Sequence, residues 1–188
     1  MESIKDKVAI IGMGCSQFGE RWDVGLDDLA IEATYEAIED AGIGLEDIQA
    51  CFLGSVISPV MGIGGSTAAD ALKLRDIPII RNENWCTTGH IALMDAAMSI
   101  MSGMFDVVLA LGVEKLKDTG SPGLGAGRGM HPVLEARRTA PGSFGMIAPA
   151  YFKKYGLSNE DGKKVIGQIA VKNHHNGIFC PYAHYRFE

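Results

Sequence analysis

The sequence predicts an α/β fold in which a mostly parallel sheet has helices on both faces, with a subdomain rich in glycine and proline after it. Three observations predict this fold. Short β-branched runs alternate with longer segments whose apolar residues recur at helical spacing. The run VVLALGV (107–113) is apolar throughout, as expected for a central strand of a parallel sheet. Residues 119–149 combine many glycines and prolines with little periodicity.

Composition and charge narrow the class of protein. The chain has 188 residues, 47% hydrophobic and 21% charged, which fits one globular domain or one domain with a subdomain. We assign residues 1–115 to an α/β core and 116–188 to a loop subdomain with helices. Lys and Arg are scattered and the net charge is −6, so nucleic acid is not an expected partner. No apolar run reaches the roughly 18 residues of a membrane span, and the charged start MESIKDK is unlike a secretory signal, so we expect a cytoplasmic protein without membrane contact.

The first half of the chain predicts alternating elements. KVAIIGMG (7–14) is a β-branched run closed by glycines, which predicts a buried strand. Apolar residues at helical spacing over 26–42 predict a helix, and Gly42 suits the position after a helix end. A strand, a helix and a strand are predicted next, over 50–58, 64–74 and 77–84. Such alternation favours right-handed crossovers between parallel strands.

The second half begins with a helix that follows Cys86. Its segment LMDAAMSIMSGM (93–104) is expected in the core, where methionine fills irregular gaps. A strand is predicted over 105–115. Residues 119–149 predict a functional loop region, because a structureless stretch of this length is uncommon in a compact domain. Helices are predicted over 148–158 and 160–177.

The four cysteines lie far apart in the sequence. Their spacing contains no C-x-x-C pair, which argues against a zinc site, a redox dithiol or a disulfide scaffold. We expect free thiols, with structural or incidental roles for Cys15, Cys51 and Cys180, and we predict neither a metal nor a bound cofactor. The histidines do not change this prediction, since a metal would need more ligands at closer spacing.

Cys86 differs from the other cysteines because it lies where a predicted strand gives way to a helix, in the segment RNENWCTTGH (81–90). Ligands of open α/β sheets gather at the carboxyl ends of the strands, where helix N-termini present unpaired N–H groups. The helix dipole favours a thiolate there, and the same N–H groups can stabilise an oxyanion. The alternative is a buried cysteine that acts as a small hydrophobe. Gly89 costs helix propensity, and close approach of a ligand or of neighbouring backbone would explain its presence.

Five motifs occur along the chain: KVAIIGMGCSQFGE, LAIEATYEAIEDAGI, ACFLGSVIS, AVKNHHNGIFCPYAHYR and, most specifically, NENWCTTGHIALMDAAMSIMSGMFDVVLALGVEKLKD. Together they resemble the thiolase family, specifically the N-terminal half of the sterol-carrier-protein-X or lipid-transfer-protein type. The resemblance extends from about residue 7 to the last residue. It implies a thiolase-like N-terminal domain.

The resemblance also implies an activity in lipid metabolism. A thiolase-type acyltransferase, either an acetyl-CoA acetyltransferase or a 3-ketoacyl-CoA thiolase, takes the acyl group from an acyl-CoA onto a cysteine, which divides one difficult carbon–carbon step into two acyl transfers. The matching position here is Cys86, and coenzyme A enters as the thioester substrate. Residues 119–149 correspond to the loop domain that contacts coenzyme A, with Phe144 and Met146 expected to line the acyl site.

Two departures from the family pattern affect the site. Thr87 and Thr88 stand where the family usually has Ala-Ser or similar residues, and His90 follows, so we expect a different pocket shape with Gly89 and His90 as substrate contacts. His90 lies one helical turn after Cys86 and is interpreted either as a base for the thiol or as an ordinary helix histidine. Family thiolases are about twice as long, and their base and second acid/base lie in a C-terminal half that we expect to be absent here, so the chain is predicted to be a fragment or half of a split enzyme.

Two other functions remain open. One is a retro-aldol carbon–carbon lyase that acts on CoA thioesters with a small partner protein, and the other is a non-catalytic subunit for acyl-CoA binding or assembly. The resemblance also implies a homodimer formed through the edge strand predicted in IPIIRNEN (77–84). An exposed β-rich edge would otherwise invite aggregation.

Overall fold

The computed structural model describes residues 4–56, 64–116 and 139–186. The chain forms two compact units. Unit 1 comprises Met1–Ser16 and Arg21–Lys115, and unit 2 comprises Gln17–Glu20 and Leu116–Glu188. Unit 2 thus includes a short segment from near the N-terminus, where the Phe18 N–H donates to the Tyr182 carbonyl oxygen at 2.9 Å.

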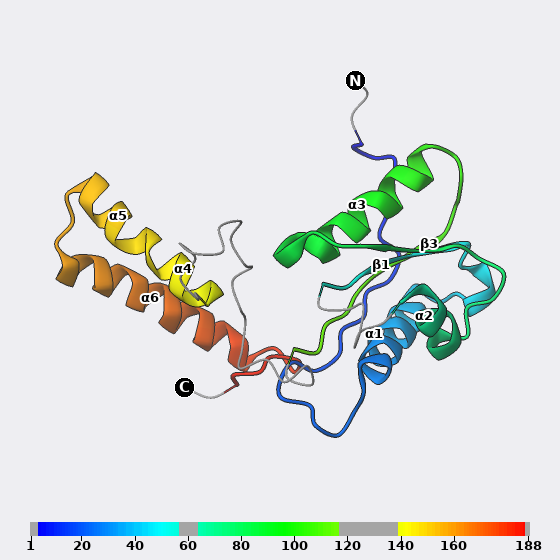
Figure 1. Cartoon of the computed structure of the whole chain (residues 1–188), viewed down its shortest axis with the longest axis horizontal. Coiled ribbons are helices and arrows are strands. Elements are labelled where there is room, and N and C mark those ends of the chain that lie inside the picture. The colour runs from blue at the N-terminus through cyan, green and yellow to red at the C-terminus, as the bar shows by residue number, and fades with distance from the viewer. Residues whose placement is uncertain (1–3, 57–63, 117–138, 187–188) are drawn as a thin grey trace, which may run out of the picture. The chain divides into compact units, whose positions relative to one another are not determined.

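Unit 1 contains a three-stranded parallel sheet in the order β2-β1-β3 (Figure 1). The strands are β1 (Ala50–Gly54), β2 (Ile79–Asn82) and β3 (Val108–Gly112). Cys51 pairs with Ile79 and Leu109, and Gly54 pairs with Asn82 and Gly112, so all three strands end in step. The predicted parallel α/β fold is confirmed.

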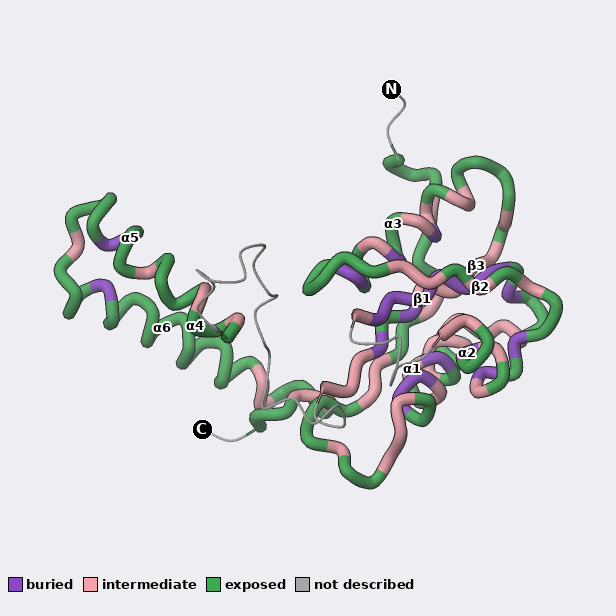
Figure 2. The backbone as a smooth tube through the Cα atoms, in the orientation of Figure 1, coloured by how far each residue is buried: buried purple, intermediate pink, exposed green. Residues whose placement is uncertain are grey.

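Helices cover both faces of this sheet (Figure 1). The helices α1 (Leu26–Ala41) and α2 (Gly65–Leu72) lie on one face, α3 (Thr88–Met101) lies on the other, and the 3-10 turn η1 (Leu45–Asp47) precedes β1. Because strand side chains alternate between faces, β1 contributes to both cores. Buried residues are concentrated along β1 (Figure 2). The first core contains Leu29, Ala30, Ile48, Cys51, Leu53, Ala68, Leu72, Leu74, Leu111 and Val113, and the second contains Ala50, Phe52, Ala92 and Ala96.

The central strand is β1, whereas the sequence predicted that position for VVLALGV. All five residues of β1 are buried, while β3, which lies within VVLALGV, is mostly half-buried at an edge of the described sheet. An apolar run cannot by itself distinguish the two positions, because an edge strand that packs against helices on both faces is also apolar, as Leu111 in one core and Val108 at the other show. ACFLG takes the centre because β2 and β3 both pair with it.

The predicted strand over 7–14 is wrong, because these residues form no strand and Ile10, Ile11 and Met13 are exposed. The end of the segment lies against α1. Side chains on Gly12 and Gly14 would collide with the carbonyl oxygens of Ala37 and Ala33. The backbone N–H groups of Met13 and Cys15 donate to the carboxylates of Asp40 (2.9 Å) and Glu36 (2.7 Å). These helix carboxylates take the place of a neighbouring strand as hydrogen-bond acceptors.

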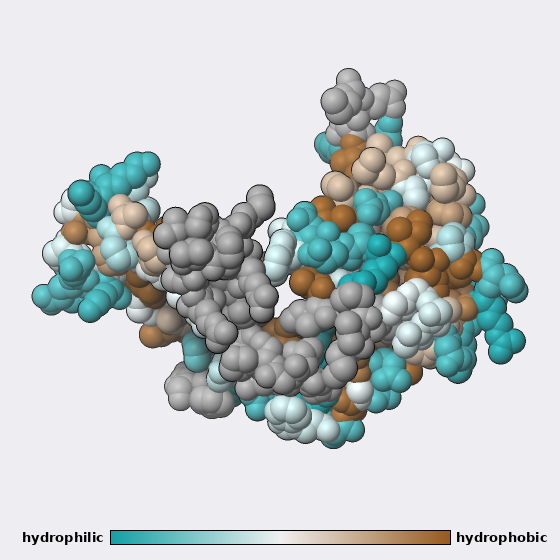
Figure 3. Space-filling model, in the orientation of Figure 1, coloured by the Kyte–Doolittle hydropathy of each residue, from teal (hydrophilic) through white to brown (hydrophobic). Residues whose placement is uncertain are grey.

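The prediction that the Met-rich part of α3 lies in the core is also wrong. Met94, Met98 and Met101 recur at helical spacing and are exposed, as is Met104 beyond the helix end. The face of α3 that packs against the sheet contains small residues instead, Ala92 and Ala96. Apolar side chains therefore reach the surface of unit 1 (Figure 3).

Unit 2 contains α4 (Ala140–Gly145), α5 (Ile147–Tyr155) and α6 (Asn159–Ile178). Part of the predicted loop over 119–149 is therefore helical, because the Thr139 hydroxyl caps α4 by accepting from the Gly142 N–H at 3.1 Å and a proline occupies its first turn. The part of that loop over residues 119–138 lies outside the described residues. Phe152 packs against Gly162, where a Cβ atom would overlap its ring. None of the described helices is long and apolar enough to span a membrane.

The buried thiol of Cys51 should make the stability of unit 1 depend on pH. Burial raises the pKa of this thiol to about 12 from its ordinary value of 9.0. Above pH 9 the unfolded chain releases the proton and the folded chain keeps it, so the free energy of unfolding should fall with rising pH, by up to about 1.4 kcal/mol per pH unit. When the free energy of unfolding in urea is measured between pH 7 and 10.5, it should decline less steeply for Cys51→Ala than for wild type. Cys180→Ala, a change at an exposed thiol, should retain the wild-type slope. Equal slopes in all three proteins would contradict this expectation.

Candidate active site

The carboxyl ends of the three strands form one edge of the sheet. Gly54, Asn82 and Gly112 end β1, β2 and β3 in register, so the segments that follow them leave the sheet at the same level. In a parallel α/β sheet this edge is where ligands bind.

Polar contacts join the three strand ends. The Arg81 guanidinium donates to the Ser55 carbonyl oxygen at 2.8 Å, and the Val56 N–H donates to the Glu114 carboxylate at 2.7 Å. The Asn82 side-chain amide donates to the Asp95 carboxylate on α3 at 3.0 Å. These contacts fix the ends of the strands and the orientation of α3 relative to β2.

The first turn of α3 lies directly against two of the terminal glycines. A Cβ atom on Gly54 would lie 2.9 Å from the Thr88 methyl carbon, and one on Gly112 would lie 3.4 Å from the Gly89 Cα atom. The first distance is shorter than real Cβ contacts allow, while the second is ordinary van der Waals contact. The absence of a side chain on Gly54 therefore allows α3 to begin at this position.

Cys86 lies in the 3-10 turn η2 (Trp85–Thr87) that connects β2 to α3, and it is exposed. Trp85, immediately before it, has φ +49°, which is an uncommon backbone conformation for a bulky residue. The Trp85 N–H donates to the Glu83 carboxylate at 2.8 Å, and the Trp85 carbonyl oxygen accepts from the Thr88 hydroxyl at 2.6 Å. Hydrogen bonds on both sides thus hold a strained residue next to the candidate nucleophile.

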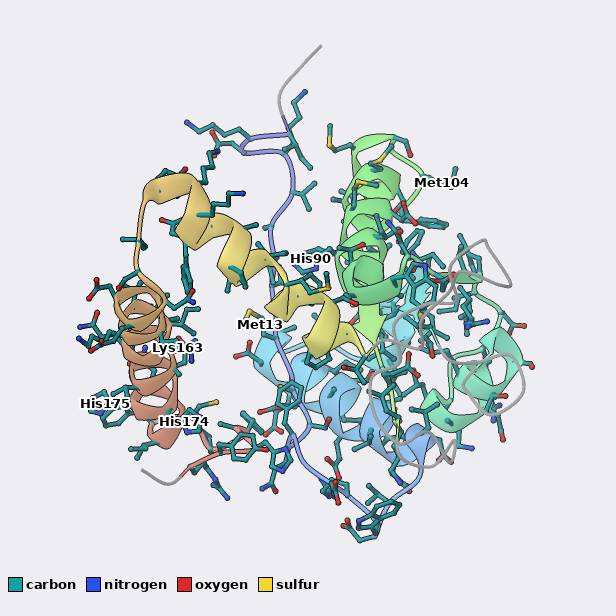
Figure 4. The ribbon with its side chains drawn as sticks, turned by 60° about the vertical axis from the view of Figure 1, so that its left-hand side comes forward. Met13, His90, Met104, Lys163, His174 and His175 are labelled. Carbon is teal, nitrogen blue, oxygen red and sulfur yellow. The ribbon has the colours of Figure 1, made fainter. Side chains whose placement is uncertain are left out.

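The other predicted site residues fall into two groups. Gly89 and His90 are in the first turn of α3 and are exposed (Figure 4). A Cβ atom on Gly89 would meet nothing within 4 Å, so packing of the described residues does not explain this glycine. No hydrogen bond between described residues joins His90 to Cys86. Phe144 and Met146 are exposed residues of unit 2, in and just after α4, and their role in lining an acyl site stays a prediction.

All four cysteines are free thiols, as predicted. Cys51 is buried, Cys15 is half-buried, and Cys86 and Cys180 are exposed. The described residues include no group of three or more His, Cys, Asp or Glu side chains arranged to hold a metal ion. Among the described cysteines, Cys86 is the exposed thiol that lies at the carboxyl edge of the sheet, so it is the candidate nucleophile of this edge.

Sequence reasoning did not predict the structural roles of two residues of this site, Thr88 and Gly54. Thr88 is buried and its hydroxyl takes part in two hydrogen bonds within the turn around Cys86. Gly54 provides the space for Thr88. The available signal was a glycine at the carboxyl end of both ACFLG and VLALG, since a glycine in a strand often marks close approach of another backbone.

Comparisons with known proteins show which family and which fold the chain is similar to. Residues 8–186 match the family described as Thiolase, N-terminal domain. The chain is 33% identical over 183 residues to an acetyl-CoA acetyltransferase of Methanothermobacter thermautotrophicus, which covers 95% of this chain and 47% of that protein. It is 30% identical over 199 residues to sterol carrier protein 2 of Bos taurus, which covers 98% of this chain and 36% of that protein. The chain thus spans about half the length of the acetyltransferase it matches.

A solved structure shows the same fold. The Acat5 thiolase from Ascaris suum, crystallised in complex with coenzyme A, aligns with 89% of this chain and 47% of its own, with a TM-score of 0.65 and 19% sequence identity. At this identity the likeness concerns the fold alone. It confirms the α/β architecture that the sequence predicted.

Proposed function

Because this chain belongs to the thiolase family, we propose that it is the nucleophile-bearing half of a thiolase-type acyltransferase that accepts acyl groups from acyl-CoA. The observation that carries the proposal is the exposed Cys86 thiol, which lies between the carboxyl end of β2 and the first turn of α3. A buried sulfur would have favoured the purely structural interpretation.

The proposed reaction is a thioester exchange. The Cys86 thiolate attacks the thioester carbonyl carbon of the acyl-CoA, the bond from that carbon to the coenzyme A sulfur breaks, and the acyl group stays on Cys86. Coenzyme A leaves as a thiolate and takes up a proton. An exposed thiol suits this step because a large substrate must reach the sulfur, and the neighbouring Gly89 and His90 are proposed substrate contacts.

The distribution of charge supports an anionic substrate. Residues 1–116 carry 18 Asp and Glu and 7 Lys and Arg, whereas residues 117–188 carry 10 Lys and Arg and 5 Asp and Glu. Among the latter, Lys163 is on α6, on which His174 and His175 also lie (Figure 4). Coenzyme A carries several phosphate charges, which lysine and arginine side chains bind. We therefore propose that the positive charge of residues 117–188 favours an anionic substrate such as an acyl-CoA.

Mass spectrometry tests the proposed acyl-enzyme directly. The chain is incubated with acetyl-CoA, quenched in acid and digested, and the acetylated peptides are mapped. The expected result is one acetyl group on Cys86, with Cys180 unmodified, since Cys180 is exposed but far along the chain from the carboxyl edge of the sheet. Absence of acetylation, or equal acetylation of both thiols, would favour the non-catalytic binding subunit.

We further propose a homodimer formed through residues 77–84. The supporting observation is that β2 lies at an edge of the described sheet, where Ile80 is exposed. An unpaired strand edge can add a strand from another chain. Ile80→Lys introduces a charge at this edge and should shift light-scattering mass from dimer to monomer, while Ile10→Lys, at a more exposed position outside the sheet, should leave the mass unchanged. A monodisperse wild-type monomer would contradict the proposed dimer.

A further inference from the structure

The turn that contains Cys86 is closed by one hydroxyl group. The Thr88 hydroxyl accepts from the Asn84 N–H at 2.8 Å and donates to the Trp85 carbonyl oxygen at 2.6 Å. It therefore bonds to the two residues that directly precede Cys86. Each bond is of ordinary or short length for its type.

The rest of the Thr88 side chain faces the sheet. Its methyl carbon is the atom nearest to the position that a Cβ on Gly54 would occupy, and the residue is only 5% exposed. The methyl group thus lies against the end of β1, while the hydroxyl group binds the turn between β2 and α3. One side chain connects the rigid sheet to the backbone that carries the nucleophile.

The conformation held in this way is costly to maintain. A bulky residue such as Trp85 at φ +49° is strained, and a strained residue persists only where its surroundings fix it. The bond from the Thr88 hydroxyl to the Trp85 carbonyl oxygen and the bond from the Trp85 N–H to Glu83 are the side-chain contacts that fix it. Loss of the hydroxyl removes one of these contacts and the acceptor of the Asn84 N–H.

We propose that Thr88 is a positioning residue for the Cys86 nucleophile. Its hydroxyl holds the backbone at Asn84 and Trp85 so that the Cys86 sulfur has one direction of approach to an acyl-CoA carbonyl. This inference rests on the proposed acyl transfer and adds a residue to it. The hydroxyl does not touch the substrate; it acts through the turn.

The test compares two reactions of the same sulfur. Acylation by acetyl-CoA requires a defined geometry, whereas alkylation by iodoacetamide, a small reagent, requires only an accessible thiol. Thr88→Val retains the shape and the methyl contact and removes the hydroxyl. Acetylation of Cys86 should slow by about tenfold, as expected when two hydrogen bonds of ordinary strength are lost. Alkylation of Cys86 should change by less than about twofold, because the thiol remains exposed in an intact fold.

Two further variants complete the comparison. Thr88→Ser retains the hydroxyl and should restore most of the acetylation rate. Ser99→Ala is the control: it also removes a hydroxyl from α3, one that donates to the Ala96 carbonyl oxygen at 2.7 Å and lies 13 residues after Cys86 in the sequence. Its acetylation rate should stay close to wild type. If Thr88→Val does not fold, as judged by circular dichroism, Thr88→Ser and Thr88→Ala answer the same question.

The outcomes separate this inference from the proposed function. Wild-type protein that is not acetylated at Cys86 contradicts the acyl transfer, and the positioning role with it. Rapid acetylation of both wild type and Thr88→Val contradicts the positioning role alone. A parallel loss of acetylation and gain of alkylation in Thr88→Val indicates local unfolding, which also overturns the positioning role.

Discussion

Replacement of Cys86 by alanine is expected to abolish the acyl-enzyme. The alanine variant has no sulfur to accept the acyl group, so acetyl transfer from acetyl-CoA should fall at least about a thousandfold, to the background of the other thiols, as it does when a covalent nucleophile is removed. Because Cys86 is exposed, the change in unfolding free energy should stay within about 0.5 kcal/mol. The loss of acetyl transfer would then result from the missing sulfur and not from unfolding of the protein.

The matched control for this variant is Cys180→Ala. Both cysteines are exposed, and they lie in different units of the chain. Acetyl incorporation, measured by mass spectrometry of the intact protein, should be unchanged in Cys180→Ala and lost in Cys86→Ala. Retention of one acetyl group by Cys86→Ala would place the nucleophile elsewhere and contradict the proposed function.

Replacement of Gly54 by alanine is expected to destabilise unit 1 by about 2 kcal/mol, because the added Cβ atom cannot fit between β1 and the first turn of α3. It would lie 2.9 Å from the Thr88 methyl carbon and 3.0 Å from the Thr88 carbonyl oxygen. The second contact is with backbone, which cannot rotate away. Thr88 must therefore move, and the rate of Cys86 acetylation should fall together with stability.

Gly112→Ala provides a graded control for this prediction. Gly112 ends the neighbouring strand in register with Gly54, and a Cβ atom there would make only ordinary contact, at 3.4 Å from the Gly89 Cα atom. Its effect on stability should be within about 0.5 kcal/mol. Both tryptophans, Trp22 and Trp85, lie in unit 1, so urea unfolding followed by tryptophan fluorescence reports on this unit. Equal stability of the two alanine variants would contradict the packing argument.

The sequence predicted those elements whose pattern is local. The helix over 26–42 is observed as α1 (Leu26–Ala41), and Gly42 follows it with φ +67°, as glycine after a helix end allows. The parallel sheet follows from strands separated by helices, and the position of Cys86 between β2 and α3 follows from the boundary between a β-branched run and a helical one. These features depend on neighbouring residues alone.

The errors concern contacts that sequence periodicity does not contain. KVAIIGMG has the composition of a strand, but the pairing of a strand depends on the free edges of the sheet, and here the carboxylates of Glu36 and Asp40 on α1 bind the backbone N–H groups of Met13 and Cys15. The order of strands in a sheet is likewise a tertiary property, so VVLALGV was wrongly predicted to be central. In the site, the pair Thr87-Thr88 was visible as a departure from the family pattern, but sequence alone does not show which hydroxyl faces inward.

The backbone of Trp85 has a consequence for laboratory evolution. A left-handed conformation favours glycine or asparagine, so a library randomised at position 85 and screened only for heat resistance should become enriched in these two residues. The same replacements give the polypeptide freedom to leave that conformation in the step before Cys86. A screen for the proposed acetyl transfer should therefore select different amino acids at this position, so selection for heat resistance alone should lower the rate of that transfer.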